Sequence, residues 1–301
     1  MPDTPALSQI LLELSDAIEE LALLLAKQKV TDREESVKKL HLLTRKIKKL
    51  QTGDDSLKDK IVKKYKKGFI NNYLNIRKIY NGKHINNLKV DQKLYQIADY
   101  LVDHYIGLEE FYKKLKYHQN IKRDFVAHTN KSSLAYIRKW SRMLHDNKII
   151  DTFALLDQDK IDVDIAQVAN ATNYINGRWL EIFLRAELAK FMRQNINEIS
   201  SFDIMAQVEV QLPDRKTSEL DLLLMINGKI YWFECKSGQI GSKYYKIFRK
   251  HKEYLQLPEA QSFLLVPEMN LNQAEAVKKR SGMTLLYATQ IEQQLKQYLL
   301  K

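Results

Sequence analysis

Two apolar segments joined by Asn227-Gly228 constrain the fold of this chain more than any other feature. Asn-Gly is the strongest two-residue signal for a β-hairpin, because both residues tolerate the positive φ angles of a type I′ turn. The flanking segments, residues 219–226 and 229–235, are almost wholly apolar, as in strands that are covered on both faces of a sheet. The pattern predicts a buried hairpin over residues 219–235.

Acidic residues interrupt both predicted strands at matching positions. In a two-residue hairpin, each step back along the first strand corresponds to a step forward along the second. This register places Asp221 opposite Glu234, and Glu219 opposite Lys236. All four side chains are expected on one face, because side chains alternate along a strand. Facing Cβ atoms lie about 5 Å apart, so the two carboxylates Asp221 and Glu234 are predicted to meet at bridging distance for one cation.

Two buried carboxylates repel each other, and a divalent cation would make their proximity tolerable. Oxygen ligands favour Mg²⁺ or Mn²⁺, either of which can activate water for attack on a phosphodiester. We therefore predict Asp221, Glu234 and Glu181 as metal ligands, with Glu181 supplied by the preceding helix. These three residues and Lys236 form the predicted catalytic set, in which Lys236 orients or deprotonates the water, or stabilises the developing charge. The alternative is a charge pair on a solvent-exposed face, which the apolar strands disfavour.

The elements around the hairpin alternate between helices and strands. Hydrophobic periodicity and turn residues predict helices over residues 178–194, 242–254, 270–279 and 290–299, and strands over residues 206–212, 219–226, 229–235, 262–266 and 283–287. The expected C-terminal fold is therefore an α/β domain with the hairpin at its centre.

The spacing of the acidic residues resembles that of the PD-(D/E)XK nuclease superfamily. Asp221 and the run Glu234-Cys235-Lys236 follow a helix with Glu181. More narrowly, residues 177–181, 218–221 and 233–238 resemble the nuclease domain of the CRISPR-associated, cyclic-oligoadenylate-activated endonucleases. The resemblance implies a restriction-endonuclease-like fold, metal association of the three acids, a catalytic lysine and cleavage with Mg²⁺ or Mn²⁺. Antiviral defence, restriction and repair all employ this fold, and the biological context stays open among them.

The other end of the chain departs from that family, which opens with a Rossmann-like sensor domain for the cyclic nucleotide. Residues 1–120 show no Val/Ile-rich strands alternating with helices and no Gly-rich βα turn. We expect this stretch to be all-helical, so activation by cyclic oligoadenylate is not predicted.

Three regions are expected. Leucines and isoleucines at heptad spacing in residues 7–25 and 40–50 predict a helical hairpin that folds back on the protein or pairs with a second copy. Residues 93–165 show three helices and then two strands, 148–156 and 160–165, which is the order of a winged helix-turn-helix. The predicted division is a basic helical region (1–92), a winged-helix-like connector (93–170) and the nuclease domain (171–301). A homodimer would form through the N-terminal helices or the nuclease domain.

The charge of the chain favours an anionic partner. Lysine and arginine number 49 against 37 aspartate and glutamate residues, a net charge of +12. Such a surplus suits nucleic acid, with DNA expected over RNA, whereas the alternative is a solvated charged surface. The predicted nucleic-acid contacts lie on two helices: Arg138, Lys139 and Arg142 on the third connector helix, and Lys243, Lys246, Arg249 and Lys250 on the helix after the hairpin.

Other properties restrict the classes of protein. No apolar run approaches the roughly 20 residues of a membrane span, and the N-terminus lacks the features of a secretory signal. Cys235 is the single cysteine, which excludes an intrachain disulfide and suits the reducing cytoplasm. Two alternatives to a nuclease remain at this point: a catalytically inactive nucleic-acid-binding module, and an assembly protein built on its helical hairpin.

Overall fold

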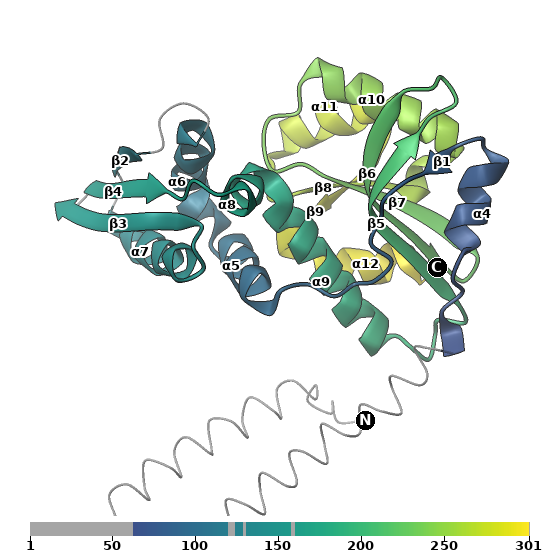
Figure 1. Ribbon diagram of the computed structural model, residues 1–301, viewed down its shortest axis with the longest axis horizontal. Coiled ribbons are helices and arrows are strands. Elements are labelled where there is room, and N and C mark those ends of the chain that lie inside the picture. The colour runs from purple at the N-terminus through teal and green to yellow at the C-terminus, as the bar shows by residue number, and fades with distance from the viewer. Residues whose placement is uncertain (1–62, 120–123, 129–130, 158–159, 301) are drawn as a thin grey trace, which may run out of the picture. The chain divides into compact units, whose positions relative to one another are not determined.

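The computed structural model describes residues 63–119, 124–128, 131–157 and 160–300 (Figure 1). The chain divides into two compact units, Met1–Lys63 and Lys64–Lys301, and the fold described below is that of the second. The predicted N-terminal helical hairpin and its self-pairing lie outside the described residues.

A six-stranded mixed sheet forms the centre of this unit, with the strand order β1-β5-β6-β7-β8-β9. The first four strands pair with one another in antiparallel fashion, whereas β8 pairs in parallel with both β7 and β9. The strands are β1 (Tyr80–Asn81), β5 (Phe202–Gln211), β6 (Thr217–Ile226), β7 (Lys229–Cys235), β8 (Ser262–Val266) and β9 (Thr284–Tyr287).

The predicted hairpin is confirmed as β6 and β7. Asn227 and Gly228 both have positive φ angles, 53° and 81°, as a type I′ turn requires. The register runs as predicted from the turn as far as the pair Leu222–Phe233. The Asn227 side chain adds a second anchor, because its Oδ1 accepts a hydrogen bond of 2.7 Å from the Ser200 amide.

Helices cover both faces of the sheet (Figure 1). On one face lie α4 (Phe69–Ile76), α10 (Ser242–Leu255) and α11 (Leu271–Ser281), and on the other lie α9 (Trp179–Gln194) and α12 (Ile291–Leu299). Trp232 of β7 and Phe248 of α10 are fully buried in the core between the sheet and the helices α4, α10 and α11. Burial of a large apolar side chain stabilises the fold by about 1.5–3 kcal/mol. This burial on both faces explains why β6 and β7 are so apolar.

The described residues before α5, 63–91, differ from their prediction. Instead of being all-helical, they contribute β1, whose Tyr80 and Asn81 pair with Gln211 and Val210 of β5. The preceding helix α4 buries Ile70 and Leu74 in the core of the sheet. A strand of two residues is too short to show an alternating pattern in the sequence. It forms because the edge of β5 offers it backbone hydrogen-bond partners. The all-helical prediction was therefore wrong for this stretch.

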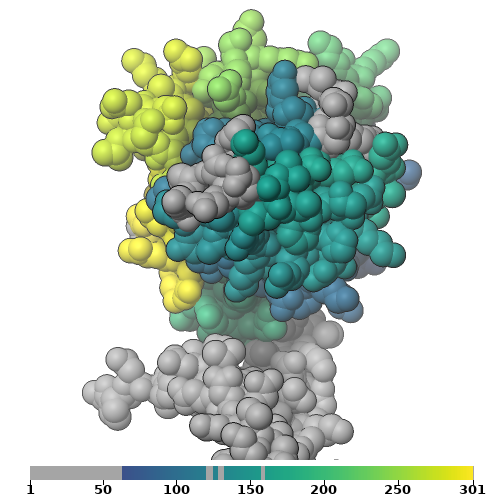
Figure 2. Space-filling model, turned by 90° about the vertical axis from the view of Figure 1, so that its left-hand side faces the viewer, coloured from purple at the N-terminus to yellow at the C-terminus, as the bar shows by residue number. Residues whose placement is uncertain are grey.

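A second group of elements lies between β1 and β5 in the chain, and we call it the α5–β4 module. It forms the blue-to-teal surface toward the viewer in Figure 2, and its strand order is β2-β4-β3. The three predicted helices and the hairpin are present, whereas β2 was not predicted, and the winged-helix assignment stays a prediction. The elements are α5 (Gln92–Asp103), α6 (Tyr105–His118), β2 (Asp124–His128), α7 (Lys131–Asp146), β3 (Ile150–Asp157) and β4 (Lys160–Ile165).

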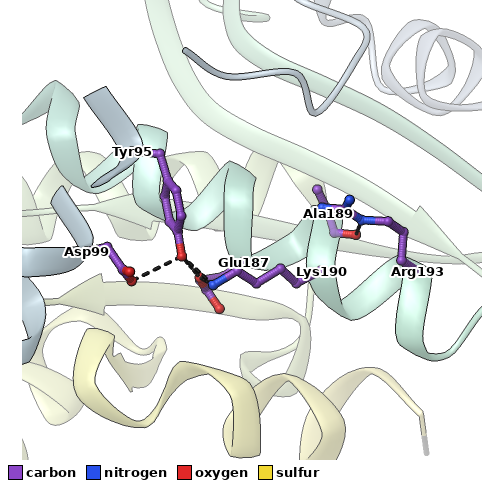
Figure 3. A network of polar contacts seen from close by, with 6 residues as sticks. All are labelled: Tyr95, Asp99, Glu187, Ala189, Lys190 and Arg193. Atoms are coloured by element: carbon purple, nitrogen blue, oxygen red, sulfur yellow. Dashed lines mark hydrogen bonds and ion pairs between the residues drawn. The ribbon is translucent and has the colours of Figure 1, made fainter. Parts of the chain in front are cut away.

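A polar network joins α5 to α9 (Figure 3). The Tyr95 hydroxyl lies 2.8 Å from a Glu187 carboxylate oxygen and 3.0 Å from Asp99, and Lys190 pairs with Glu187 at 2.8 Å. Burial and the Glu187 charge raise the pKa of Tyr95, so its hydroxyl keeps its proton. Helix α9 is thereby held by the α5–β4 module as well as by the sheet, which gives its first turn a defined position.

The connection into α9 is short and bent. Helix α8 (Ala169–Asn173) is followed by the π-helical turn η2 (Tyr174–Arg178), in which Gly177 has a φ angle of 140°. The first turn of α9 then carries Glu181.

In the part of the chain that the structure describes, no helix has the length and apolar character needed to cross a bilayer.

Candidate active site

A pocket of about 440 Å³ opens where β6 and β7 separate, and we call it the acidic pocket. Glu181 of α9 and Glu219 and Asp221 of β6 line it, together with Lys236, which directly follows β7. The structure thus brings the predicted site residues from both the hairpin and the preceding helix to one place. Glu234 is only 6% exposed and does not belong to the lining of the pocket.

Asp221 lies at the point where the strand ladder ends. Beyond the pair Leu222–Phe233 the two strands no longer pair, and the Asp221 carboxylate instead accepts a hydrogen bond of 2.7 Å from the Cys235 amide. Burial raises the pKa of Asp221, although Lys236 and the Cys235 amide both oppose the rise. The predicted ladder therefore stops one pair short of Asp221 and Glu234, yet the two carboxylates remain close enough for the charge of Asp221 to act on Glu234.

Glu234 is a buried carboxyl group with only one satisfied oxygen. Its Oε1 accepts a hydrogen bond of 2.7 Å from the Lys236 ammonium, whereas its Oε2 is buried without a hydrogen-bond partner among the described residues. Burial, followed by repulsion from Asp221, raises the pKa of Glu234 to about 8. An unsatisfied buried acceptor costs about 1–3 kcal/mol, and a proton or a cation would relieve that cost.

Glu181 is the third carboxyl group of the site. Burial, followed by the charge of Asp221, raises the pKa of Glu181 to about 7. The Gln207 side-chain amide donates a hydrogen bond of 3.0 Å to Glu181 Oε2 and so fixes the direction of this carboxylate.

Gln207 lies in the middle of β5 with a φ angle of 50°. The neighbouring pairs, Ala206–Leu222 and Val208–Leu220, place it opposite Asp221. Such a backbone angle costs a residue other than glycine about 1–3 kcal/mol, and strain of this kind concentrates at functional sites. Sequence analysis missed Gln207, because a glutamine in a strand gives no sign of its φ angle or of its partner.

The carboxylate oxygens of Glu181, Asp221 and Glu234 are of the ligand type that a hard cation such as Mg²⁺ prefers. Among the described residues, no three acidic, histidine or cysteine side chains converge closely enough to hold a metal ion by themselves. Asp221 lines the pocket, whereas the Oε2 atom of Glu234 is buried without a hydrogen-bond partner among the described residues. Magnesium and manganese are commonly held by one or two carboxylates and retained waters, and this arrangement suits them better than zinc.

Lys236 lies near both the acidic side chains of the site and two aromatic rings. Its ammonium lies 5.5 Å from the ring centre of Tyr244 and 5.9 Å from that of Phe248. Burial lowers the pKa of Lys236, but Glu234 and Asp221 more than offset this effect, so the net shift is upward. A lysine that stays protonated offers hydrogen-bond donors and positive charge, which favours orienting water and stabilising charge over removing a proton.

The seven predicted nucleic-acid contacts lie outside the described lining of the acidic pocket. Lys250 forms an ion pair with Asp214, and Arg249 donates a hydrogen bond of 3.3 Å to a backbone carbonyl. The Lys139 ammonium lies 4.8 Å from the ring centre of Tyr100. The remaining four are exposed and stay predicted contacts: Arg138, Arg142, Lys243 and Lys246.

Gly177 permits a close approach that sets the rim of the pocket. A Cβ atom at this position would lie 2.8 Å from Ser237 Oγ, and the φ angle of 140° is strained for any other residue. We expect Gly177→Ala to lower the free energy of unfolding by about 1–3 kcal/mol and to displace Ser237, the neighbour of Lys236. Chemical denaturation measures the loss. Gly241→Ala is the matched control, because it has negative φ and open space around it, and equal losses in both variants would contradict the prediction.

Comparisons with known proteins concern the fold. No family model matches this chain, and no curated protein matches it. Two solved structures are similar: protein VC1899 from Vibrio cholerae, with 19% identity and a TM-score of 0.53, and Can2 from Sulfobacillus thermosulfidooxidans in complex with cyclic tetra-adenylate, with 14% identity and a TM-score of 0.54. The matches cover 75% and 76% of this chain but 60% of each neighbour. The chain therefore has a mixed α/β fold like that of Can2, over less than two thirds of the length of these neighbours.

Proposed function

We propose that this protein is a metal-dependent nuclease of the PD-(D/E)XK type that hydrolyses phosphodiester bonds, with DNA as the preferred substrate. The observation that carries the proposal is the half-buried Asp221 close to the buried Glu234, of which one carboxylate oxygen has no hydrogen-bond partner among the described residues and the other lies 2.7 Å from the Lys236 ammonium. A protein does not bury such a group without cost, and a bound cation would offset that cost where the carboxyl group is ionised.

Each residue of the site has a distinct proposed role. Asp221 and Glu234 would hold Mg²⁺ or Mn²⁺, and Glu181 would complete the shell directly or through water. The ion, when bound, supplies Lewis acidity toward the phosphate and lowers the pKa of its water. Lys236 places positive charge where a phosphoryl group gains negative charge, and Gln207 holds Glu181 in position.

Two resemblances support this function, one of the motif and one of the fold. The motif residues resemble those of the CRISPR-associated, cyclic-oligoadenylate-activated endonucleases, and the fold resembles that of Can2, which was solved with cyclic tetra-adenylate. The net charge of +12 suits a polyanionic substrate. Antiviral defence is the biological role that these resemblances favour.

A cleavage assay with a substrate panel tests the proposal. The full-length protein is incubated with single- and double-stranded DNA and RNA in Mn²⁺, in Mg²⁺ and in EDTA. We expect cleavage only with a divalent cation, faster on DNA than on RNA. Asp221→Asn keeps an acceptor for the Cys235 amide but removes a charge, and we expect it to reduce cleavage about 100-fold.

The same assay contains the result that would reject the proposal. Equal cleavage by the wild type and Asp221→Asn would mean that the activity has another source. Binding of DNA without cleavage in either cation would instead favour an inactive nucleic-acid-binding module.

A further inference from the structure

Lys116 reaches the acidic pocket from outside the nuclease-like sheet. It belongs to α6 of the α5–β4 module, yet it lines the pocket together with Glu181, Asp221 and Lys236. Its ammonium donates a hydrogen bond of 3.1 Å to the hydroxyl of Ser237, the residue that follows Lys236. The module therefore contributes a cation to a site that otherwise comes from the sheet and α9.

The surroundings of Lys116 are built to hold it there. Tyr112, one helical turn earlier, places its hydroxyl 2.8 Å from Ser237 Oγ, and its ring centre lies 5.9 Å from the Lys116 ammonium. The Trp179 indole donates a hydrogen bond of 3.0 Å to the same Tyr112 hydroxyl. Gly238 leaves the necessary room, since a Cβ atom there would lie 3.1 Å from Lys116 Nζ. Helix α6, helix α9 and the segment after β7 thus together place the Lys116 ammonium at the edge of the acidic pocket.

The electrostatics of the pair Lys116 and Lys236 point to an anionic ligand. Burial and the positive charge of Lys236 lower the pKa of Lys116, so holding both ammonium groups near each other costs free energy. The negative charge of a phosphate bound between or beside the two ammonium groups would offset that cost. In the transition state of hydrolysis, the phosphoryl group of a nucleic acid carries close to two negative charges. Its non-bridging oxygens can accept hydrogen bonds from more than one ammonium group.

We propose that Lys116 is a phosphate-binding residue of the active site, which contacts the substrate backbone beside Lys236 and makes the α5–β4 module part of the catalytic centre. This inference rests on the proposed function and extends it, because the substrate would have to bind both parts of the unit at once. Sequence analysis missed Lys116, which lies in no motif and far from the hairpin along the chain.

The salt dependence of DNA binding tests this contact. Affinity for a labelled DNA duplex is measured by fluorescence anisotropy in EDTA between 50 and 200 mM salt, about the range over which phosphate contacts are counted from the slope. We expect Lys116→Gln to reduce the slope of log K against log [salt] by about 0.9, the value of one phosphate contact to B-form DNA. Lys116→Arg keeps the charge and should keep the slope.

A matched variant separates a phosphate contact from a general loss of positive charge on α6. Lys113 lies on the same helix, is exposed and pairs with Glu109 and Glu110, so Lys113→Gln should leave the slope unchanged. A wild-type slope in Lys116→Gln, or the same reduction of the slope in Lys113→Gln, would overturn the proposal.

Cleavage in Mn²⁺ by the same variants separates this inference from the nuclease proposal. We expect Lys116→Gln to lower the single-turnover rate by about 10–100-fold and Lys113→Gln to match the wild type. If the wild type cleaves no substrate while Lys116→Gln still reduces the slope of log K against log [salt] by about 0.9, the phosphate contact stands and the nuclease proposal fails. If the wild type cuts and Lys116→Gln behaves as Lys113→Gln does, the nuclease proposal stands and the role of Lys116 is rejected.

Discussion

Glu234→Gln is expected to reduce metal-dependent cleavage by about 10²–10³-fold while making the metal-free protein more stable at alkaline pH. The substitution preserves the size of the side chain and an acceptor for Lys236, but it removes the negative charge that a cation would need. It also removes a buried ionisable group whose charged form is costly in the folded state. A gain in stability coupled to a loss of function would mark this carboxylate as kept for binding and catalysis.

The direction of the stability change follows from the pKa of Glu234. The folded value of about 8 lies above the ordinary value of 4.5, so the folded state holds this proton more tightly than the unfolded state. Its contribution to stability is therefore complete below pH 4.5 and is lost as the pH rises through 8. Glutamine does not titrate, so the variant escapes this loss. We expect a gain of about 1–3 kcal/mol at pH 9, after allowance for the lost ion pair with Lys236.

Urea denaturation of both proteins at pH 5 and pH 9 in EDTA measures this effect. Glu219→Gln is the matched control, because Glu219 lines the same pocket but is exposed, and we expect less than about a tenfold change in its cleavage rate. A Glu234→Gln variant that is less stable than the wild type at pH 9, or one that still cuts at the wild-type rate, would contradict the prediction.

The sequence predicted the centre of the fold because its determinants are local. Asn227-Gly228 defines the turn, the turn defines the register, and the register places Asp221 and Glu234 near each other. The same local rules located the bounds of β7 and β8 and the start of α10. Where periodicity and turn chemistry suffice, prediction from the sequence succeeds.

The parts that were missed depend on partners that are distant in the sequence. Strand β1 exists because β5 offers it an edge, and β2 exists because β4 does. At the site, the positive φ angle of Gln207 and the approach of Lys116 to Ser237 both arise from tertiary packing. The ladder also ends before Asp221, because the alternation of side chains predicts which residues face each other but not where two twisted strands separate.

The affinity of the site for Mn²⁺ is expected to rise steeply with pH. Glu181 and Glu234, with pKa values of about 7 and about 8, hold protons at pH 6 that a cation must displace. Binding therefore releases protons, and its apparent affinity grows as the carboxyl groups ionise. From these two values we expect a gain of about 10²–10³-fold between pH 6 and pH 8, whereas carboxylates with ordinary pKa values would give almost none.

Isothermal titration calorimetry in buffers of different ionisation enthalpy measures both the affinity and the number of protons released. We expect close to two protons per Mn²⁺ at pH 6 and fewer at pH 8, because part of the Glu181 and Glu234 population is then already ionised. Glu181→Gln should release about one proton fewer at pH 6 while retaining weaker binding, since Asp221 and Glu234 remain. An affinity that stays constant from pH 6 to pH 8 would show that Mn²⁺ binds elsewhere on the protein, and these carboxyl groups would then need another explanation for their burial.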